Sequence, residues 1–169
     1  MIGTQHDTPA TMIGDVNLFL TPHDEDEDDE EERADGKIEN DRVQGVVGEV
    51  EIMIAEKGFQ GKGLGKEILL VFMWYVLCSV GEIMKEYREG GDGNGNGKEE
   101  SCLRYLRVKI DQENVRSIRL FEGVGFKKVT EEADYFGELE LRLVVSGKSR
   151  GEVDGRLDKV PQELEYKMP

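Results

Sequence analysis

The stretch of this sequence best suited to chemistry is a glycine-rich turn. Glycines alternate with larger residues over Gly61–Gly65, shortly after the apolar run Ile52–Ala55 and at the start of a long helical pattern that begins at Leu64. Alternating glycines let the backbone adopt positive φ and approach a ligand closely. The amides of such a turn converge on an anion, and the first N–H groups of a following helix add donors. The pattern predicts a phosphate-binding turn, flanked by Lys62 and Lys66.

The spacing of these glycines excludes two common phosphate motifs. A P-loop needs glycine, four residues and then Gly-Lys-Ser/Thr, but Lys66 is followed by Glu67 and the upstream glycine is missing. The dinucleotide fingerprint G-x-G-x-x-G also needs a different spacing. The pattern that does fit is Q/R-x-x-G-x-G/A, which begins here at Gln60. A plain strand–turn–helix connection is the alternative interpretation of the stretch.

The chain around the turn has the elements needed to position it. Thr11–Thr21 and Val43–Ala55 are predicted strands that pair antiparallel. Leu64 to about Tyr87 is predicted to be one helix, mostly buried because it is apolar nearly all round. Cys102–Ile110 is predicted to be a further strand. Strand, helix and strand in this order form a βαβ unit, with parallel pairing and a right-handed crossover.

A second block of interest follows that unit. Asn114 is placed to cap a short helix over Ser117–Val124, and Gly125 stands where a helix C-terminus favours glycine. Phe126–Thr130 and Gly137–Val145 are predicted to be two final strands.

These two motifs, in this order, resemble the GCN5-related N-acetyltransferase (GNAT) superfamily. The glycine turn resembles its acetyl-CoA loop, and Asn114–Phe126 resembles its N-x-x-[SA]-x-x-x-[YF]-E-K-x-G-F block. The resemblance covers roughly residues 12–145 and extends, in Met12–Leu20 and Gly48–Glu56, to one eukaryotic branch of the superfamily. It implies an α/β (α+β) fold, a mixed sheet flanked by helices. It also implies a first strand and two helices ahead of Met12, where only eleven residues stand.

The resemblance implies acetyl-CoA as co-substrate and transfer of acetyl to a protein or peptide amine by direct attack. The turn amides would hold the pyrophosphate, with Gln60 bracing the loop, and the backbone near Met53 and Ile54 would bind the pantetheine arm and polarise the thioester. The residues implied in cofactor binding are Met53, Ile54, Gln60, Gly61, Lys62, Gly63, Leu64, Gly65, Lys66, Asn114 and Phe121.

Three side chains are candidates for proton transfer. Glu49 and Glu51 share one face of a predicted strand, next to the thioester by resemblance, and Glu51 is preferred as the base because it is nearer the turn. A solvated strand face is the alternative for both. Ser117 matches a serine that some protein N-terminal acetyltransferases place near the sulfur, and a helix first-turn hydroxyl is its alternative. Phe121 stands where many relatives have a tyrosine that protonates the leaving thiolate.

That missing tyrosine supports a second hypothesis from another functional class. The chain could be a non-catalytic acyl-CoA-binding or scaffold protein that keeps the fold. The absent N-terminal elements would also leave part of the sheet uncovered, so self-association through that face is expected.

Composition limits the other functions. The net charge is −15, and Asp24–Glu32 is an unbroken acidic run, so neither nucleic-acid binding nor a basic surface is predicted. His6 and His23 lie in polar sequence and Cys78 and Cys102 in apolar sequence, so no metal site is expected and the cysteines are predicted free.

The sequence shows no membrane or targeting segment. Ile68–Val80 is too short to span a bilayer, no signal peptide is apparent, and a soluble, cytoplasmic or nuclear protein is expected.

The rest of the chain is predicted to lie outside the packed domain. Residues 1–11 and 146–169 are predicted to be disordered ends, and 22–42 and 89–100 to be loop insertions in a single domain over 12–145.

Overall fold

A computed structural model describes residues 11–23, 43–90, 100–159 and 161 of the chain. The acidic run Asp24–Glu32, residues 91–99 of the second expected insertion and the first ten residues lie outside the described part.

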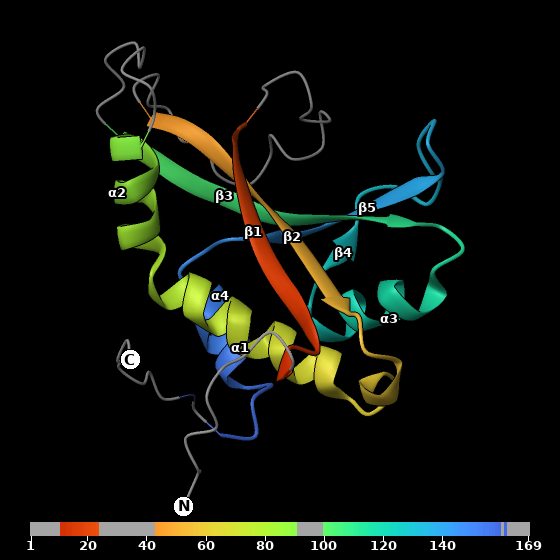
Figure 1. Cartoon of the computed structure of the whole chain (residues 1–169). Helices are drawn as coiled ribbons and strands as arrows, with labels where there is room; N and C mark the ends of the chain where they lie inside the picture. The colour runs from red at the N-terminus through yellow and green to blue at the C-terminus, as the bar shows by residue number, and fades with distance from the viewer. Residues whose placement is uncertain (1–10, 24–42, 91–99, 160, 162–169) are drawn as a thin grey trace, which may run out of the picture.

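A five-stranded mixed sheet lies at the centre of the molecule, with strand order β1-β2-β3-β5-β4 (Figure 1). The strands are β1 Gly14–Pro22, β2 Val43–Ile54, β3 Glu100–Asp111, β4 Lys127–Lys128 and β5 Glu138–Val144. β1 pairs antiparallel with β2, β2 parallel with β3, and β5 antiparallel with both β3 and β4. The α/β class, the antiparallel first pair and the parallel β2–β3 pair predicted from the sequence are confirmed.

The parallel ladder between β2 and β3 stops partway along the two strands. Its last pair is Glu49 opposite Arg107. Beyond that pair β2 stays bonded to β1 as far as Ile54, and β3 stays bonded to β5 as far as Asp111. The sheet therefore divides into two blocks, β1–β2 and β3–β5–β4, which separate at the C-terminal ends of the parallel strands.

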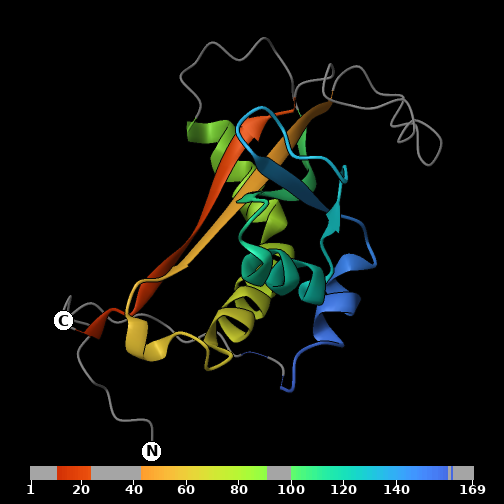
Figure 2. The same ribbon diagram turned by 90° about the vertical axis from the view of Figure 1, so that its right-hand side faces the viewer.

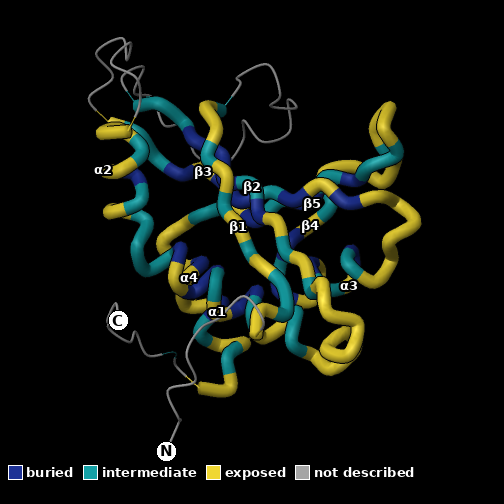
Figure 3. Tube along the Cα trace, in the orientation of Figure 1, coloured by how far each residue is buried: buried dark blue, intermediate teal, exposed yellow. Residues whose placement is uncertain are grey.

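Helices pack against the sheet and build one core. They are α1 Leu64–Cys78, α2 Val80–Gly90, α3 Val115–Val124 and α4 Ser149–Asp154. Figures 1 and 2 show α1 lying beneath the sheet with α4 beside it, and in Figure 1 α3 lies below the right-hand end of β3. Figure 3 shows the buried residues gathered along the strands and the inner sides of these helices. Fully buried side chains include Leu69, Met73 and Val76 of α1, Val46 and Val50 of β2, Leu106 of β3 and Leu141 of β5.

The expectation of one continuous helix over Leu64–Tyr87 is wrong. The chain bends by 72° between α1 and α2, and Ser79 caps α1 by donating its N–H to the Tyr75 carbonyl at 2.9 Å. After the bend α2 buries Met84 and packs beside β3. No single described helix is long and apolar enough to cross a membrane, although the bent pair α1–α2 passes that test by length and composition.

The expected disordered tail is also wrong where α4 forms. Val153 is 1% exposed, and the buried Ser149 hydroxyl donates to the Val144 carbonyl at 2.9 Å and accepts from the Ser146 N–H at 2.9 Å. These two contacts dock a mostly polar segment on the core. Other bounds also differ: β1 begins at Gly14, α3 begins at Val115, β4 has only two residues, α2 reaches Gly90 and β3 begins at Glu100.

Candidate functional site

The glycine turn has the backbone that its sequence predicts. Gly61 and Gly63 have φ of +75° and +86°, a region that other residues rarely adopt. Gly63 caps the N-terminus of α1, and its carbonyl accepts the N–H groups of Lys66 and Glu67 at 3.0 and 3.3 Å. The first N–H groups of a helix have no partner within it. The turn therefore presents unshielded backbone donors at the positive end of α1.

The side chain of Gln60 fixes the turn to the sheet. Its Nε2 donates to the carbonyl oxygen of Ile54, the last residue of β2, at 2.7 Å. The neighbouring Lys62 ammonium lies over the Phe59 ring, 5.2 Å from the ring centroid. Gln60 thus braces the loop, the role predicted for it. The hydrogen bond ties the turn to β2, the strand beside the split.

A first hollow of about 600 Å³ lies between this turn, the end of β2 and the start of α3. Of the described residues that line it, Lys66 and Arg116 are cationic and none is acidic. The structure brings together most of the residues predicted for cofactor binding. Those lining the hollow are Met53, Ile54, Gln60, Gly61, Gly63, Gly65, Lys66 and Asn114. Lys62 and Leu64 are not among its lining residues.

A second hollow, of about 440 Å³, adjoins the first along the split. It holds the three proton-transfer candidates, Glu49, Glu51 and Ser117, together with the buried Phe121. The residues common to both hollows are Ile52, Met53, Asn114 and Ser117. A ligand in one hollow can therefore meet a ligand in the other at the end of β2.

The second hollow is strongly acidic. Its described lining includes one cation, Lys109, against five carboxylates. The carboxylates are those of Asp15, Glu49, Glu51, Asp111 and Glu138. The resulting potential favours a positively charged ligand.

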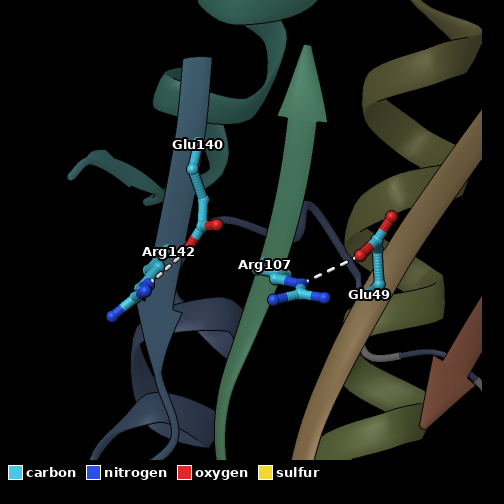
Figure 4. A network of polar contacts seen from close by, with 4 residues as sticks. All are labelled: Glu49, Arg107, Glu140 and Arg142. Atoms are coloured by element: carbon cyan, nitrogen blue, oxygen red, sulfur yellow. Dashed lines mark hydrogen bonds and ion pairs between the residues drawn. The ribbon is translucent and has the colours of Figure 1, made fainter. Parts of the chain in front are cut away.

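The two candidate bases differ in their surroundings. Glu49 accepts a hydrogen bond from Arg107 Nε at 2.8 Å and is 26% exposed (Figure 4). Glu51 is exposed and forms no ion pair with the described residues. The Glu49 carboxylate is engaged by Arg107 whereas the Glu51 carboxylate is open, so the geometry favours Glu51 as the carboxylate that an amine can reach.

The start of α3 is organised by Asn114. Its side-chain oxygen accepts the Ser117 N–H at 3.2 Å, which is the predicted cap. Phe121 is 2% exposed and packs edge-to-face against Phe126 with ring centroids 5.1 Å apart. Phe121 is therefore a core residue at the wall of the second hollow, with no hydroxyl to donate.

Sequence reasoning missed Arg116. Its Nη2 lies 3.4 Å from the position that a Cβ on Gly61 would occupy, so the guanidinium faces the turn. Its signal was its place between Asn114 and Ser117 in the second motif. Elsewhere in the described chain, no group of three or more His, Cys, Asp or Glu side chains is placed to hold a metal, and Cys78 and Cys102 are free.

The mixed sheet, with a glycine turn at the open end of a split parallel pair, agrees with the comparison with known families, which assigns the chain to a class of acetyltransferases. Residues 3–127 match the model of the acetyltransferase (GNAT) domain. The chain belongs to the GNAT acetyltransferase family.

Within that family the chain is similar to N-acetyltransferase 9. It is 36% identical over 139 residues to an N-acetyltransferase 9-like protein of Schizosaccharomyces pombe, covering 79% of this chain and 56% of that protein. It is 33% identical over 141 residues to the alpha/beta-tubulin-N-acetyltransferase 9 of Mus musculus, covering 83% and 42%. The chain thus spans about half the length of the curated relatives it matches. Among solved structures, an aminoglycoside N(6')-acetyltransferase of Legionella pneumophila superposes with a TM-score of 0.44 at 12% identity, covering 84% and 60%.

Proposed function

We propose that this chain is an acetyl-CoA-dependent N-acetyltransferase domain that transfers acetyl to a protein or peptide amine by direct attack. The observation that carries the proposal is the positive-φ turn at Gly61 and Gly63, set at the open end of a split parallel pair. Family membership supports acetyl transfer as the type of reaction.

The first hollow fits the phosphate-bearing part of acetyl-CoA. A Cβ on Gly63 would meet nothing within 4 Å, so the space beside the turn is open. Lys66 and Arg116 supply positive charge, and the turn and the start of α1 supply backbone donors. When bound, acetyl-CoA supplies the activated acetyl group. The backbone groups of β2 that face the split beyond Glu49 have no strand partner in the described sheet, so they can orient the acyl arm.

The chain's own side chains would move the protons. The Glu51 carboxylate accepts the proton that the ammonium must lose before its nitrogen can attack. The Ser117 hydroxyl, which borders both hollows, would donate a proton to the departing sulfur and take back, through water, the proton that the attacking nitrogen loses as the amide forms. Phe121 has no proton to give, so this step falls to Ser117 or to water.

The acidic second hollow supports a cationic acceptor. An ammonium is itself positive, and a Lys or Arg next to it would gain further from five carboxylates against one lysine. Three relatives carry tubulin in their names. A protein amine in basic sequence is accordingly the acceptor class proposed for this chain, with tubulin peptides first to be tried.

The test is turnover of acetyl-CoA with peptides that differ only in charge beside the reacting amine, followed by mass spectrometry. The expected result is acetylation that favours Lys or Arg at the next position over Asp or Glu. Glu51→Gln should lower kcat by about a hundredfold, the low end of general-base effects, and leave CoA affinity unchanged. CoA binding without turnover of any peptide would support the acyl-CoA-binding scaffold instead.

A further inference from the structure

We propose that Glu49 and Arg107 are a positioning pair, which fixes the point where β2 and β3 separate and thereby the opening of both hollows. The inference rests on the proposed function, because it concerns the same split. It gives Glu49 a role other than that of the base.

The pair stands at the last rung of the parallel ladder. Glu49 lies opposite Arg107, and past them β2 is bonded only to β1 while β3 is bonded only to β5 in the described sheet. Each block is thus held internally by its own antiparallel ladder. A side-chain contact at the final rung joins the blocks at the place where backbone hydrogen bonds between them end.

The contact is short and largely shielded from water. Arg107 Nε donates to Glu49 Oε2 at 2.8 Å, and the two side chains are 14% and 26% exposed. Figure 4 shows them meeting across the space between β2 and β3. A charge-assisted hydrogen bond in such surroundings is screened less than an exposed surface pair, so its loss has a larger effect.

The neighbouring strand gives the Glu49 carboxylate a further role at this place. Arg107 lies opposite Arg142 of β5, and like charges directly opposite each other destabilise a sheet. Arg142 has a carboxylate of its own, since its Nε donates to Glu140, and its guanidinium lies 4.4 Å from the Tyr105 ring centroid. Removing Glu49 would therefore leave two guanidinium groups facing each other without the carboxylate on β2, at the narrow end of the split.

The groups around Glu49 also determine how a pH profile would respond. Arg107 faces it from β3 and the apolar Phe19 from β1, while Glu51 lies two residues further along β2. Lys109 lies two residues after Arg107 on β3, and Arg142 of β5 lies opposite Arg107. Glu51, the proposed base, is untouched by a change at Glu49, so the pH dependence of turnover should survive the loss of Glu49.

The experiment compares Glu49→Gln, Arg107→Met and the reciprocal double variant Glu49→Arg with Arg107→Glu. Two properties are measured on the purified chain: the CoA dissociation constant by calorimetry, and amide hydrogen exchange at residues 47–49 and 105–107. Each single variant should weaken CoA binding by about tenfold, between the effects of exposed and buried pairs, and speed exchange at those amides. The reciprocal variant should recover most of both.

The matched control is Glu89→Gln, which breaks an exposed ion pair to Lys85, 3.9 Å long, on α2. It should change neither property. Arg107→Lys keeps the charge without the Nε donor and serves if Arg107→Met does not fold; its effect should be intermediate.

Unchanged affinity and exchange in folded single variants would overturn the proposal. So would a reciprocal variant that recovers wild-type amide exchange but not its CoA affinity, because Glu49 itself would then be required. In peptide turnover, Glu49→Gln should keep the wild-type pH dependence of kcat, and loss of the acidic limb would make Glu49 the base. A wild-type chain that binds no CoA would contradict the proposed function. Hydrogen exchange in the variants would then still test whether Glu49 and Arg107 fix the point where β2 and β3 separate.

Discussion

At the scale of single residues, Gly63 is the position in the turn that should tolerate substitution least. Gly63→Glu is expected to abolish measurable CoA binding, because a carboxylate would stand beside the pyrophosphate. The positive φ of +86° adds backbone strain of about 1–2 kcal/mol. Calorimetry on the folded variant measures the loss.

Two further variants separate charge from strain in that experiment. Gly63→Ala carries the strain without the charge. Gly147→Glu adds the same charge at a place where a Cβ meets nothing within 4 Å. Wild-type affinity in folded Gly63→Glu would contradict the phosphate assignment.

Arg116 supports a second prediction at this scale. Its guanidinium faces the turn, and hydrogen bonds between charged groups contribute about 1.5–3 kcal/mol, so Arg116→Ala should weaken CoA binding by at least about tenfold. Arg119→Ala is the control, since Arg119 is exposed on the same helix and is not among the residues lining the first hollow. Equal affinities for the two variants would remove Arg116 from the site.

The sequence supported most of the turn but not the arginine beside it. Alternating glycines have a backbone requirement that is local, and the brace from Gln60 spans only six residues. An arginine in the first turn of a helix is usually a solvated side chain. Arg116 meets the turn only because α3 packs at the open end of the split, which is a tertiary effect.

Among the elements, α4 offers the clearest test because sequence patterns gave no sign of it. Val153→Ala should lower the free energy of unfolding by about 1–2 kcal/mol, the cost of deleting buried methyl groups. Urea denaturation measures the change, and Val129→Ala, at a position that is 38% exposed, should cost much less. Equal effects for the two would mean that α4 does not pack as described.

The elements that sequence analysis described wrongly have no local sequence signal. The strands of the sheet alternate apolar and polar residues, and that local signal predicted β1, β2, β3 and β5. The helix break at Ser79 has no proline, and an apolar segment without a distinct polar face does not reveal where it turns. α4 has one buried apolar residue, Val153, and the hydroxyl of Ser149, so only its contacts with the core fix it.

At the scale of the whole molecule, the edge of the sheet predicts self-association of the isolated chain. Phe19 and Met53, 51% and 53% exposed, lie on one face of β1 and β2, and β1 is an edge strand of the described sheet. Light scattering coupled to size exclusion should give a mass above the 19.1 kDa of the monomer that rises with concentration.

The variant Phe19→Thr keeps a residue suited to a strand and should reduce that association. Tyr135→Thr removes an aromatic that is 96% exposed on another part of the surface and should not. A monomer at every concentration would show that the uncovered face does not associate.

The parallel direction of β2 and β3 has a practical consequence for engineering. Both hollows lie where these strands end, whereas β1 ends at Pro22, opposite Val46, and β2 begins at Val43, opposite Glu100 of β3. The chain positions that join residues 24–42 and 91–99 to the described fold are thus gathered at the end of the sheet far from the two hollows. A fluorescent protein or affinity tag spliced there would be carried away from the hollows, so reporter fusions of this domain are best built at those joints and not near the turn.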